Sequence, residues 1–301
     1  MEQSEKMSQE VIEKCPVCNN DKFNIFFVCK DFLLTGESFP VVKCDKCGFT
    51  FTNPRPSANE LGRYYKSTDY ISHSNSRKGL FNSVYQAVRN YTLKRKYELI
   101  SGIVPVGSIL DIGCATGEFL NTMKTHHWNV TGIEPDEQVR TAANEKYGIK
   151  VHDEAALDSL PSKSFDVITM WHVLEHVPQL NERIEQCKNL LKPGGYIFIA
   201  VPNSESYDAA QYKEFWAAYD VPRHLYHFSK QTIKILIENH NMKISEILPM
   251  KFDSFYVSIL SEKNKGNNLP WIKAIWNGFW SNLKAKEKMN FSSLIFVIEN
   301  E

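Results

Sequence analysis

The chain has 301 residues, which is enough for one large domain and a smaller one. Lysines and arginines together number 35, as do aspartates and glutamates, so the formal net charge is zero. This balance argues against bulk attraction to nucleic acid, although a local basic patch is compatible with it. The polar start of the chain lacks a signal-peptide pattern, and no run of about eighteen apolar residues predicts a membrane span. We therefore expect a cytoplasmic protein.

Four of the seven cysteines form two CxxC pairs: Cys15, Cys18, Cys44 and Cys47. Two thiolates from each pair give the tetrahedral sulfur set of a structural zinc site. Asn19 and Gly48 follow the pairs, and both tolerate the left-handed turn that such a knuckle needs. Residues 1–56 are therefore predicted to form a small zinc ribbon after a frayed tail over residues 1–14. Iron binding and a redox role are the alternatives.

The segment 57–100 is predicted to be a helical lead-in, with a short helix over 57–65, a polar loop over 66–79 and a longer helix over 80–100. The stretch from Arg77 to Glu98 is strongly basic. This basic face is explained either by solvation or by contact with an anionic substrate.

Strands and helices alternate in the remaining domain, residues 101–301. Apolar runs that predict strands lie at 108–112, 129–133, 165–170 and 196–201. Helical patterns between them lie at 117–126, 136–147 and 181–192. The alternation predicts an α/β fold with a doubly wound, mostly parallel seven-stranded sheet. Ligands of such sheets bind outside the carboxyl ends of the strands.

The C-terminal part adds two candidate strands, at 243–248 and 293–299, around an aromatic insertion near 266–290. The apolar residues of the insertion predict a helix with a broad aromatic face. A core lid, a homodimer contact and peripheral docking on a membrane with lipid-linked substrate are the alternatives.

A glycine-containing loop, Ile109–Gly117, follows the first of these strands and opens a helix. Its glycines allow the backbone to approach a ligand closely. The loop is not the dinucleotide fingerprint, and Asp111 at the strand end would repel a pyrophosphate while suiting a cationic amino group. Glu134 ends the next strand, where an acid can accept two hydrogen bonds from ribose hydroxyls.

These segments resemble class I methyltransferases that depend on S-adenosylmethionine (SAM). Further matching segments follow in the family's order at Ser164–Ile168, Trp171–His176 and Leu191–Gly195. The resemblance implies that Asp111 and Gly113 line the methionine and ribose part of SAM, that Glu134 holds the ribose hydroxyls and that Asp153 lies near the adenine amino group. The residues expected to bind the cofactor are Asp111, Gly113, Cys114, Ala115, Gly117, Glu134, Pro135, Asp153 and Trp171.

Candidate catalytic residues lie after the fourth and fifth strands. His224 is the leading candidate for a general base, because imidazole titrates near neutral pH, and Arg223 is a candidate anion anchor. Capping of the following helix by Ser229 is the structural alternative for this loop. His172, Glu175 and His176 are spaced to share one helix face, which could bind a divalent metal or only fix the helix to the sheet.

Three substrate classes follow from further resemblances. The loop Pro222–Leu225 is similar to loops in methyltransferases encoded with bacterial surface-polysaccharide genes, which favours a small-molecule acceptor such as a sugar or glycan intermediate. The segment Trp171–His176 is similar to quinone-biosynthesis O-methyltransferases, although His172 replaces their first carboxylate. Zinc ribbons also occur on RNA methyltransferases, but the ribbon here has no basic footprint.

Overall fold

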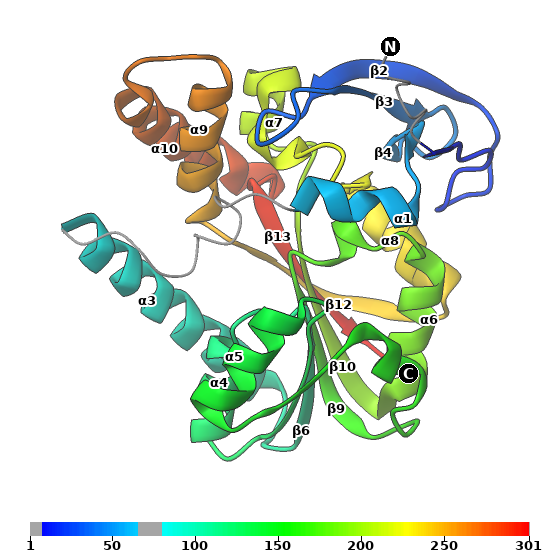
Figure 1. The fold of residues 1–301 in the computed structure, drawn as a ribbon, viewed down its shortest axis with the longest axis vertical. Coiled ribbons are helices and arrows are strands. Elements are labelled where there is room, and N and C mark those ends of the chain that lie inside the picture. The colour runs from blue at the N-terminus through cyan, green and yellow to red at the C-terminus, as the bar shows by residue number, and fades with distance from the viewer. Residues whose placement is uncertain (1–7, 66–79, 301) are drawn as a thin grey trace, which may run out of the picture.

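The computed structural model describes residues 8–65 and 80–300, so the polar loop expected at 66–79 lies outside the described residues. A seven-stranded sheet in the order β12-β13-β10-β9-β6-β7-β8 forms the centre of the molecule (Figure 1). All neighbouring strands are parallel except β13, which is antiparallel to β10 and β12. The predicted doubly wound, mostly parallel sheet is confirmed. Its strands are β6 Ser108–Ile112, β7 Asn129–Ile133, β8 Lys150–His152, β9 Phe165–Trp171, β10 Leu191–Pro202, β12 Lys243–Pro249 and β13 Ser293–Glu299.

Helices cover both faces of this sheet because its strands are apolar on both sides. Ile109 packs toward one face and its neighbour Leu110 toward the other, as alternation along a strand requires. The face of Ile109 carries α3 Leu80–Ile103, α4 Glu118–Thr125 and α5 Glu137–Tyr147. The face of Leu110 carries α6 Leu180–Leu190 and α8 Lys230–Asn239, together with part of the cysteine module.

The cysteine module is built on a four-stranded sheet whose last strand comes from far along the chain. Its order is β11-β4-β3-β2, with β2 Phe23–Lys30, β3 Ser38–Cys44, β4 Thr50–Thr52 and β11 Tyr226–His227. The loop that precedes β11 carries Arg223 and His224. The module is therefore bonded directly to the segment in which the catalytic candidates lie.

The residues that the sequence predicts as helix caps end or begin their helices in the structure. Asp136 accepts the backbone N–H of Val139 as an N-cap, and Gly148 ends the same helix with φ +56°. Ser229 caps α8 through a reciprocal pair of bonds with Thr232, so the structural alternative for the preceding loop is confirmed for this residue.

Some boundaries differ from the sequence prediction. Gln9–Glu10, expected in a frayed tail, forms β1 and pairs with β5, Arg55–Pro56. The helix expected to end at residue 192 ends at Leu190, because the chain bends into β10 there with a shifted register. The lead-in contains α1 Ala58–Leu61, the 3₁₀ turn η1 Gly62–Tyr65 and α3, which runs on to Ile103.

The aromatic insertion expected near 266–290 contains α10 Pro270–Lys288, which is the predicted helix. It forms a hairpin with α9 Asp253–Asn264, a helix that precedes the expected insertion and was not predicted. Shorter elements complete the chain: the 3₁₀ turns η2 Glu154–Asp158, η3 Leu174–His176, η4 Lys213–Phe215 and η5 Ala217–Tyr219, and the helix α7 Tyr207–Tyr212. Within the described part of the chain, no helix has the length and apolar character needed to cross a bilayer.

Candidate functional site

The loop between β6 and α4 has the backbone that a ligand-binding turn requires. Gly113 has φ +73°, and a Cβ there would lie 2.4 Å from Cγ2 of Val173. Gly117 has φ +78°, and a Cβ there would lie 2.6 Å from Cδ1 of Ile149. Both positions combine left-handed backbone with close packing, so they require glycine.

Two acids border this loop, a buried one at the end of β6 and a half-buried one after β7. Asp111 is 2% exposed and accepts a hydrogen bond of 2.5 Å from Oγ1 of Thr169. Burial raises the pKa of Asp111 to about 7, against the opposing effects of Thr169 and Lys96. Glu134 accepts the backbone N–H groups of Ala115 and Asp136, each at 3.0 Å, and burial raises its pKa as well. The two carboxylates therefore face the loop from adjacent strands.

Other expected cofactor residues surround these acids. The thiol of Cys114 is buried, and it packs where a Cβ on Gly132 would lie, only 2.7 Å from Sγ. Asp153 follows β8 and its side chain makes no cap to the 3₁₀ turn that it precedes. Pro135 follows Glu134 and starts the turn into α5.

Lysine 96 reaches this region from α3 and was not singled out from the sequence. Its Nζ lies 4.1 Å from the centre of the Trp171 ring, which also makes an edge contact with Phe119. Burial lowers the pKa of Lys96 to about 8, although Asp111 and Asp253 act in the opposite direction. By contrast, Lys94 pairs with Glu98 on the exposed side of the same helix. The basic helix thus has one solvated face and one cation directed at the strand ends.

His172 lies just after β9, with a left-handed backbone at φ +58°. Its Nε2 is 3.0 Å from Oδ2 of Asp253, and its Nδ1 is 3.4 Å from Oε1 of Glu175. Burial alone would lower the pKa of His172, but the two carboxylates raise it to about 10. The two carboxylates therefore favour the charged form of the imidazole that lies between them.

The expectation that His172, Glu175 and His176 share one helix face is wrong. His172 precedes the short turn η3 and its left-handed backbone turns its side chain away from a helical register. Instead, one ligand atom each of Glu175, His176 and His224 lies within 4.8 Å of the others. The sequence could not reveal this group, because His224 comes from a distant loop.

His224 has a defined tautomer. Its Nδ1 lies 2.8 Å from the carbonyl oxygen of Ala218, and a carbonyl only accepts, so Nδ1 carries the proton. In the neutral ring, the lone pair is therefore on Nε2. The rings of His176 and His224 meet edge to face at 4.5 Å between centroids. Burial lowers the pKa of His176 to about 4, so this ring is neutral.

Arg223, the expected anion anchor, is 1% exposed. Its guanidinium donates to Asp31 at 2.8 Å, to Asp220 at 2.6 Å and to the carbonyl of Tyr64 at 3.1 Å. Burial would lower the pKa of Arg223, but both carboxylates raise it. The guanidinium is thus engaged by protein groups, two of which belong to the N-terminal part of the chain.

The four paired cysteines converge into one cluster. Sγ of Cys15 lies 3.6 Å from Sγ of Cys47, and Sγ of Cys18 lies 3.6 Å from Sγ of Cys44. Tetrahedral zinc with Zn–S bonds of about 2.3 Å would separate its sulfurs by about 3.8 Å. The side chains therefore fit the ion that their spacing predicts.

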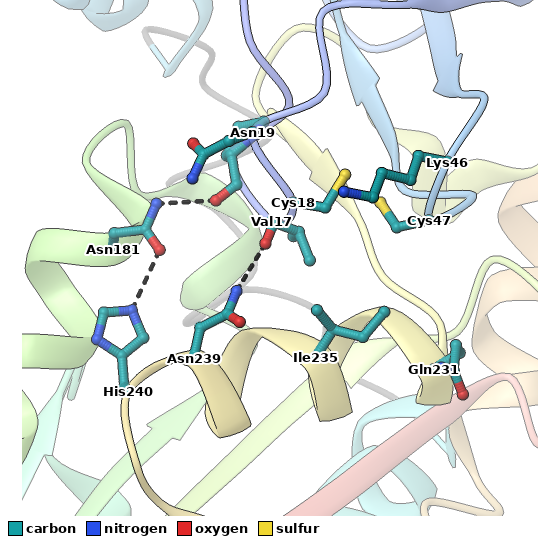
Figure 2. Close-up of a pocket in the computed structure, with 11 residues that line it drawn as sticks. Val17, Cys18, Asn19, Lys46, Cys47, Asn181, Gln231, Ile235, Asn239 and His240 are labelled. Carbon is teal, nitrogen blue, oxygen red and sulfur yellow. Dashed lines mark hydrogen bonds between the residues drawn. The ribbon is translucent and has the colours of Figure 1, made fainter.

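An open cavity of ≈ 790 Å³ lies beside this cluster, between the first knuckle and α8 (Figure 2). Asn239 donates to the carbonyl of Val17 at 2.7 Å, and Asn181 donates to that of Pro16 at 2.9 Å. His240 in turn bonds Asn181 at 3.1 Å. These polar groups hold the first knuckle against the sheet domain. The residues that line the cavity include none from the loop between β6 and α4.

Comparison with known proteins identifies the family. The profile described as "Methyltransferase domain" matches residues 85–247, which include the strand-end loop and both acids. The chain belongs to this methyltransferase family. The chain is 36% identical over 102 residues to the ubiquinone biosynthesis O-methyltransferase of Paraburkholderia phymatum, a match covering 32% of this chain and 44% of that protein. It thus spans less than half the length of the curated relatives that it matches.

Solved structures agree with the fold. Phosphoethanolamine N-methyltransferase 2 of Haemonchus contortus, determined with SAM, has a TM-score of 0.53 and 14% identity over 92% of this chain and 68% of its own. A putative sarcosine dimethylglycine methyltransferase of Galdieria sulphuraria has a TM-score of 0.50 and 11% identity, covering 71% of this chain and 86% of its own. At these identities the likeness is one of fold.

Proposed function

We propose that the methyltransferase transfers the methyl group of SAM to a hydroxyl of a small polar acceptor, a sugar or glycan intermediate, with His224 as general base. The observation that carries the proposal is the polar group beyond Trp171, made by His172, Glu175, His176 and His224. Such a lining offers hydrogen bonds to a polyhydroxylated acceptor, whereas an apolar acceptor would leave these groups unpaired.

The donor side follows from the strand ends. We assign Asp111 to the amino group of the methionine part and Glu134 to the ribose hydroxyls, with Gly113 and Gly117 providing the close backbone approach. Cys114, Ala115, Pro135, Asp153 and Trp171 would complete the cofactor wall. SAM supplies an activated methyl on a cationic sulfur, so the protein's main tasks are alignment and exclusion of water.

On the acceptor side, Nε2 of His224 would take the hydroxyl proton as the oxygen attacks. The bond from Nδ1 to Ala218 orients this lone pair. His172 would place a positive charge beside the acceptor, because Asp253 and Glu175 favour its protonated form. In place of an anion anchor, we assign Arg223 a positioning role: it holds the loop in which His224 lies.

We further propose that Cys15, Cys18, Cys44 and Cys47 bind structural zinc, and that the ribbon holds the loop before β11 that carries Arg223 and His224. Thr52 of the ribbon donates from Oγ1 to the carbonyl of His224 at 3.1 Å and from its backbone N–H to the carbonyl of Leu225 at 2.9 Å. These bonds give the module a role in holding the loop of His224. The balanced charge of the ribbon weakens the alternative, in which the ribbon binds RNA.

A second candidate is an ion-assisted O-methyl transfer of the quinone type. The convergence of Glu175, His176 and His224 favours it, because two imidazoles and a carboxylate suit a divalent ion. In that case His224 would bind the ion rather than accept a proton. The ubiquinone O-methyltransferase relatives add support for this candidate.

The test is formation of S-adenosylhomocysteine with three acceptor panels: nucleotide sugars and glycan intermediates, polyphenols, and RNA. We expect turnover with the first panel only. The variant His224→Gln should lower kcat by about 10²–10⁴-fold with unchanged SAM affinity, while the matched variant His240→Gln, beside the remote cavity, should keep full activity. Turnover with polyphenols that depends on added divalent ion would support the second candidate. Turnover with RNA alone would refute both.

A further inference from the structure

The helical hairpin α9–α10 lies outside the matched methyltransferase region and has an unusual distribution of side chains. Helix α10 packs with its small residues inward: Ala274, Gly278, Ser281 and Ala285 are buried. Gly278 allows the closest approach, since a Cβ there would lie 2.7 Å from the ring of Phe255 in α9. Large apolar residues of α10 lie on the opposite, exposed face of the helix.

That opposite face carries an exposed apolar stripe, Ile272, Trp276, Phe279 and Leu283. Their exposed fractions are 70%, 63%, 53% and 42%. The spacing of four, three and four residues places all four on one side of the helix. A contiguous exposed stripe of this kind marks a binding surface, because scattered single residues would not be so aligned.

The hairpin that carries the stripe is rich in exposed lysines. Residues 250–290 contain seven lysines and three acids, although the whole chain is neutral. Two of the acids are engaged internally: Asp253 pairs with His172, and Glu262 is 3% exposed and accepts from Tyr212. The surface that remains is therefore cationic, with lysines at positions 251, 263, 265, 273, 284, 286 and 288.

We propose that the α9–α10 hairpin docks on a membrane surface containing anionic lipid. A tryptophan-bearing apolar stripe with flanking lysines suits the boundary between acyl chains and negative headgroups. A second copy of the chain fits less well. A two-fold contact through this surface would place the lysine-rich hairpins of two copies against each other, and like charges across an interface are unfavourable.

Docking in this way has a consequence for the active site. Asp253 is the first residue of α9 and holds His172 at 3.0 Å, and Phe252 just before it makes an edge contact with Tyr91 of α3 at 5.5 Å. Figure 1 shows α9 and α10 together, with the start of α9 adjoining the sheet. The hairpin thus contacts the part of the site where the acceptor would bind. Docking of the hairpin would hold that part of the site near lipid-linked substrates.

The experiment is co-sedimentation of the full chain with vesicles of phosphatidylcholine and phosphatidylglycerol, beside vesicles of phosphatidylcholine alone. We expect binding to the mixed vesicles, weakened by salt and by omission of the anionic lipid. The double variant Ile272→Ser, Trp276→Ser should bind at least about tenfold more weakly. The matched control Val106→Ser removes an equally exposed apolar side chain, 57% exposed, before β6 and should bind normally.

A second measurement is independent of the variants: brominated lipid should quench the tryptophan fluorescence of the unaltered chain. Absence of both binding and quenching with mixed vesicles overturns the proposal. It is also overturned if sedimentation equilibrium finds a dimer that the double variant dissociates while vesicles are not bound, since the occupant would then be a second copy. If the chain binds the mixed vesicles but methylates no soluble acceptor, the proposed function is contradicted and the membrane proposal stands.

Discussion

The buried ion pair between Asp31 and Arg223 offers the sharpest test of how the two modules are joined. The carboxyl group of Asp31 is fully buried, and besides Arg223 it accepts the backbone N–H and the hydroxyl of Thr35, each at 2.9 Å. The variant Asp31→Asn keeps the shape of the side chain but removes its charge. Arg223 then keeps only Asp220 as a charged partner.

Breaking a buried pair costs about 3–5 kcal/mol because the remaining charge is uncompensated. Since Asp220 stays, we expect the lower end, about 3 kcal/mol of unfolding free energy in urea at pH 7. The matched control is Glu238→Gln, which breaks the exposed pair with Lys234 and should cost less than about 0.5 kcal/mol. We also expect a lower kcat, since Arg223 holds the loop of His224.

The pH dependence of this difference has a definite sign. Burial would raise the pKa of Asp31, but Arg223 and Thr35 hold it below its usual value of 3.8. A lowered carboxyl pKa stabilises the folded state above about pH 4 and loses that contribution as the pH falls through the folded-state pKa. The gap between the wild type and Asp31→Asn should therefore be full at pH 7 and close in acid. Equal costs for Asp31→Asn and Glu238→Gln at pH 7 would refute this reasoning.

Three further outcomes are expected. Glu134→Gln should weaken SAM binding in calorimetry by about 10–100-fold, because charge-assisted hydrogen bonds to the ribose become neutral; unchanged affinity would remove Glu134 from the site. Cys44→Ser should abolish one equivalent of zinc by elemental analysis and lower the melting temperature, and a wild type without zinc would contradict the ribbon. Asp253→Asn should lower the pKa of His172 from about 10 in an NMR titration. Because folding raises that pKa, the stability lost in Asp253→Asn should be greatest below about pH 6.5. It should decline above that pH and vanish as the pH rises through about 10.

The sequence was sufficient for the features that depend on local order. The loop Ile109–Gly117 and the acid Glu134 each end a strand, and the parallel sheet brings strand ends to one edge, so their proximity followed from the predicted alternation. The helix caps at Asp136 and Gly148 depend only on neighbouring residues. The two cysteine pairs predicted their own cluster for another reason: their types and spacing are typical of a four-thiolate site.

The features that sequence reasoning missed all depend on contacts between distant segments. Asp31 and Arg223 are 192 positions apart, and nothing near Asp31 distinguishes it from a surface acid. Asp253 begins α9, and only the packed structure brings it to His172. Lys96 was one of several basic residues on α3, and the direction of its side chain is set by Trp171.

These long-range contacts divide the site into two parts with different origins. The loop between β6 and α4 is held by groups of the sheet domain, as by the packing of Gly113 against Val173, and Asp111 before it accepts a bond from Thr169 of β9. The loop that carries His224 is held from both modules: Thr52 of the ribbon donates to the carbonyl of His224 at 3.1 Å, and Leu225 donates to the carbonyl of Glu175 in the sheet domain at 2.8 Å. A change in the cysteine module should therefore alter acceptor turnover before it alters SAM affinity. Chelation of zinc that lowered both equally would mean that the two parts are not separable.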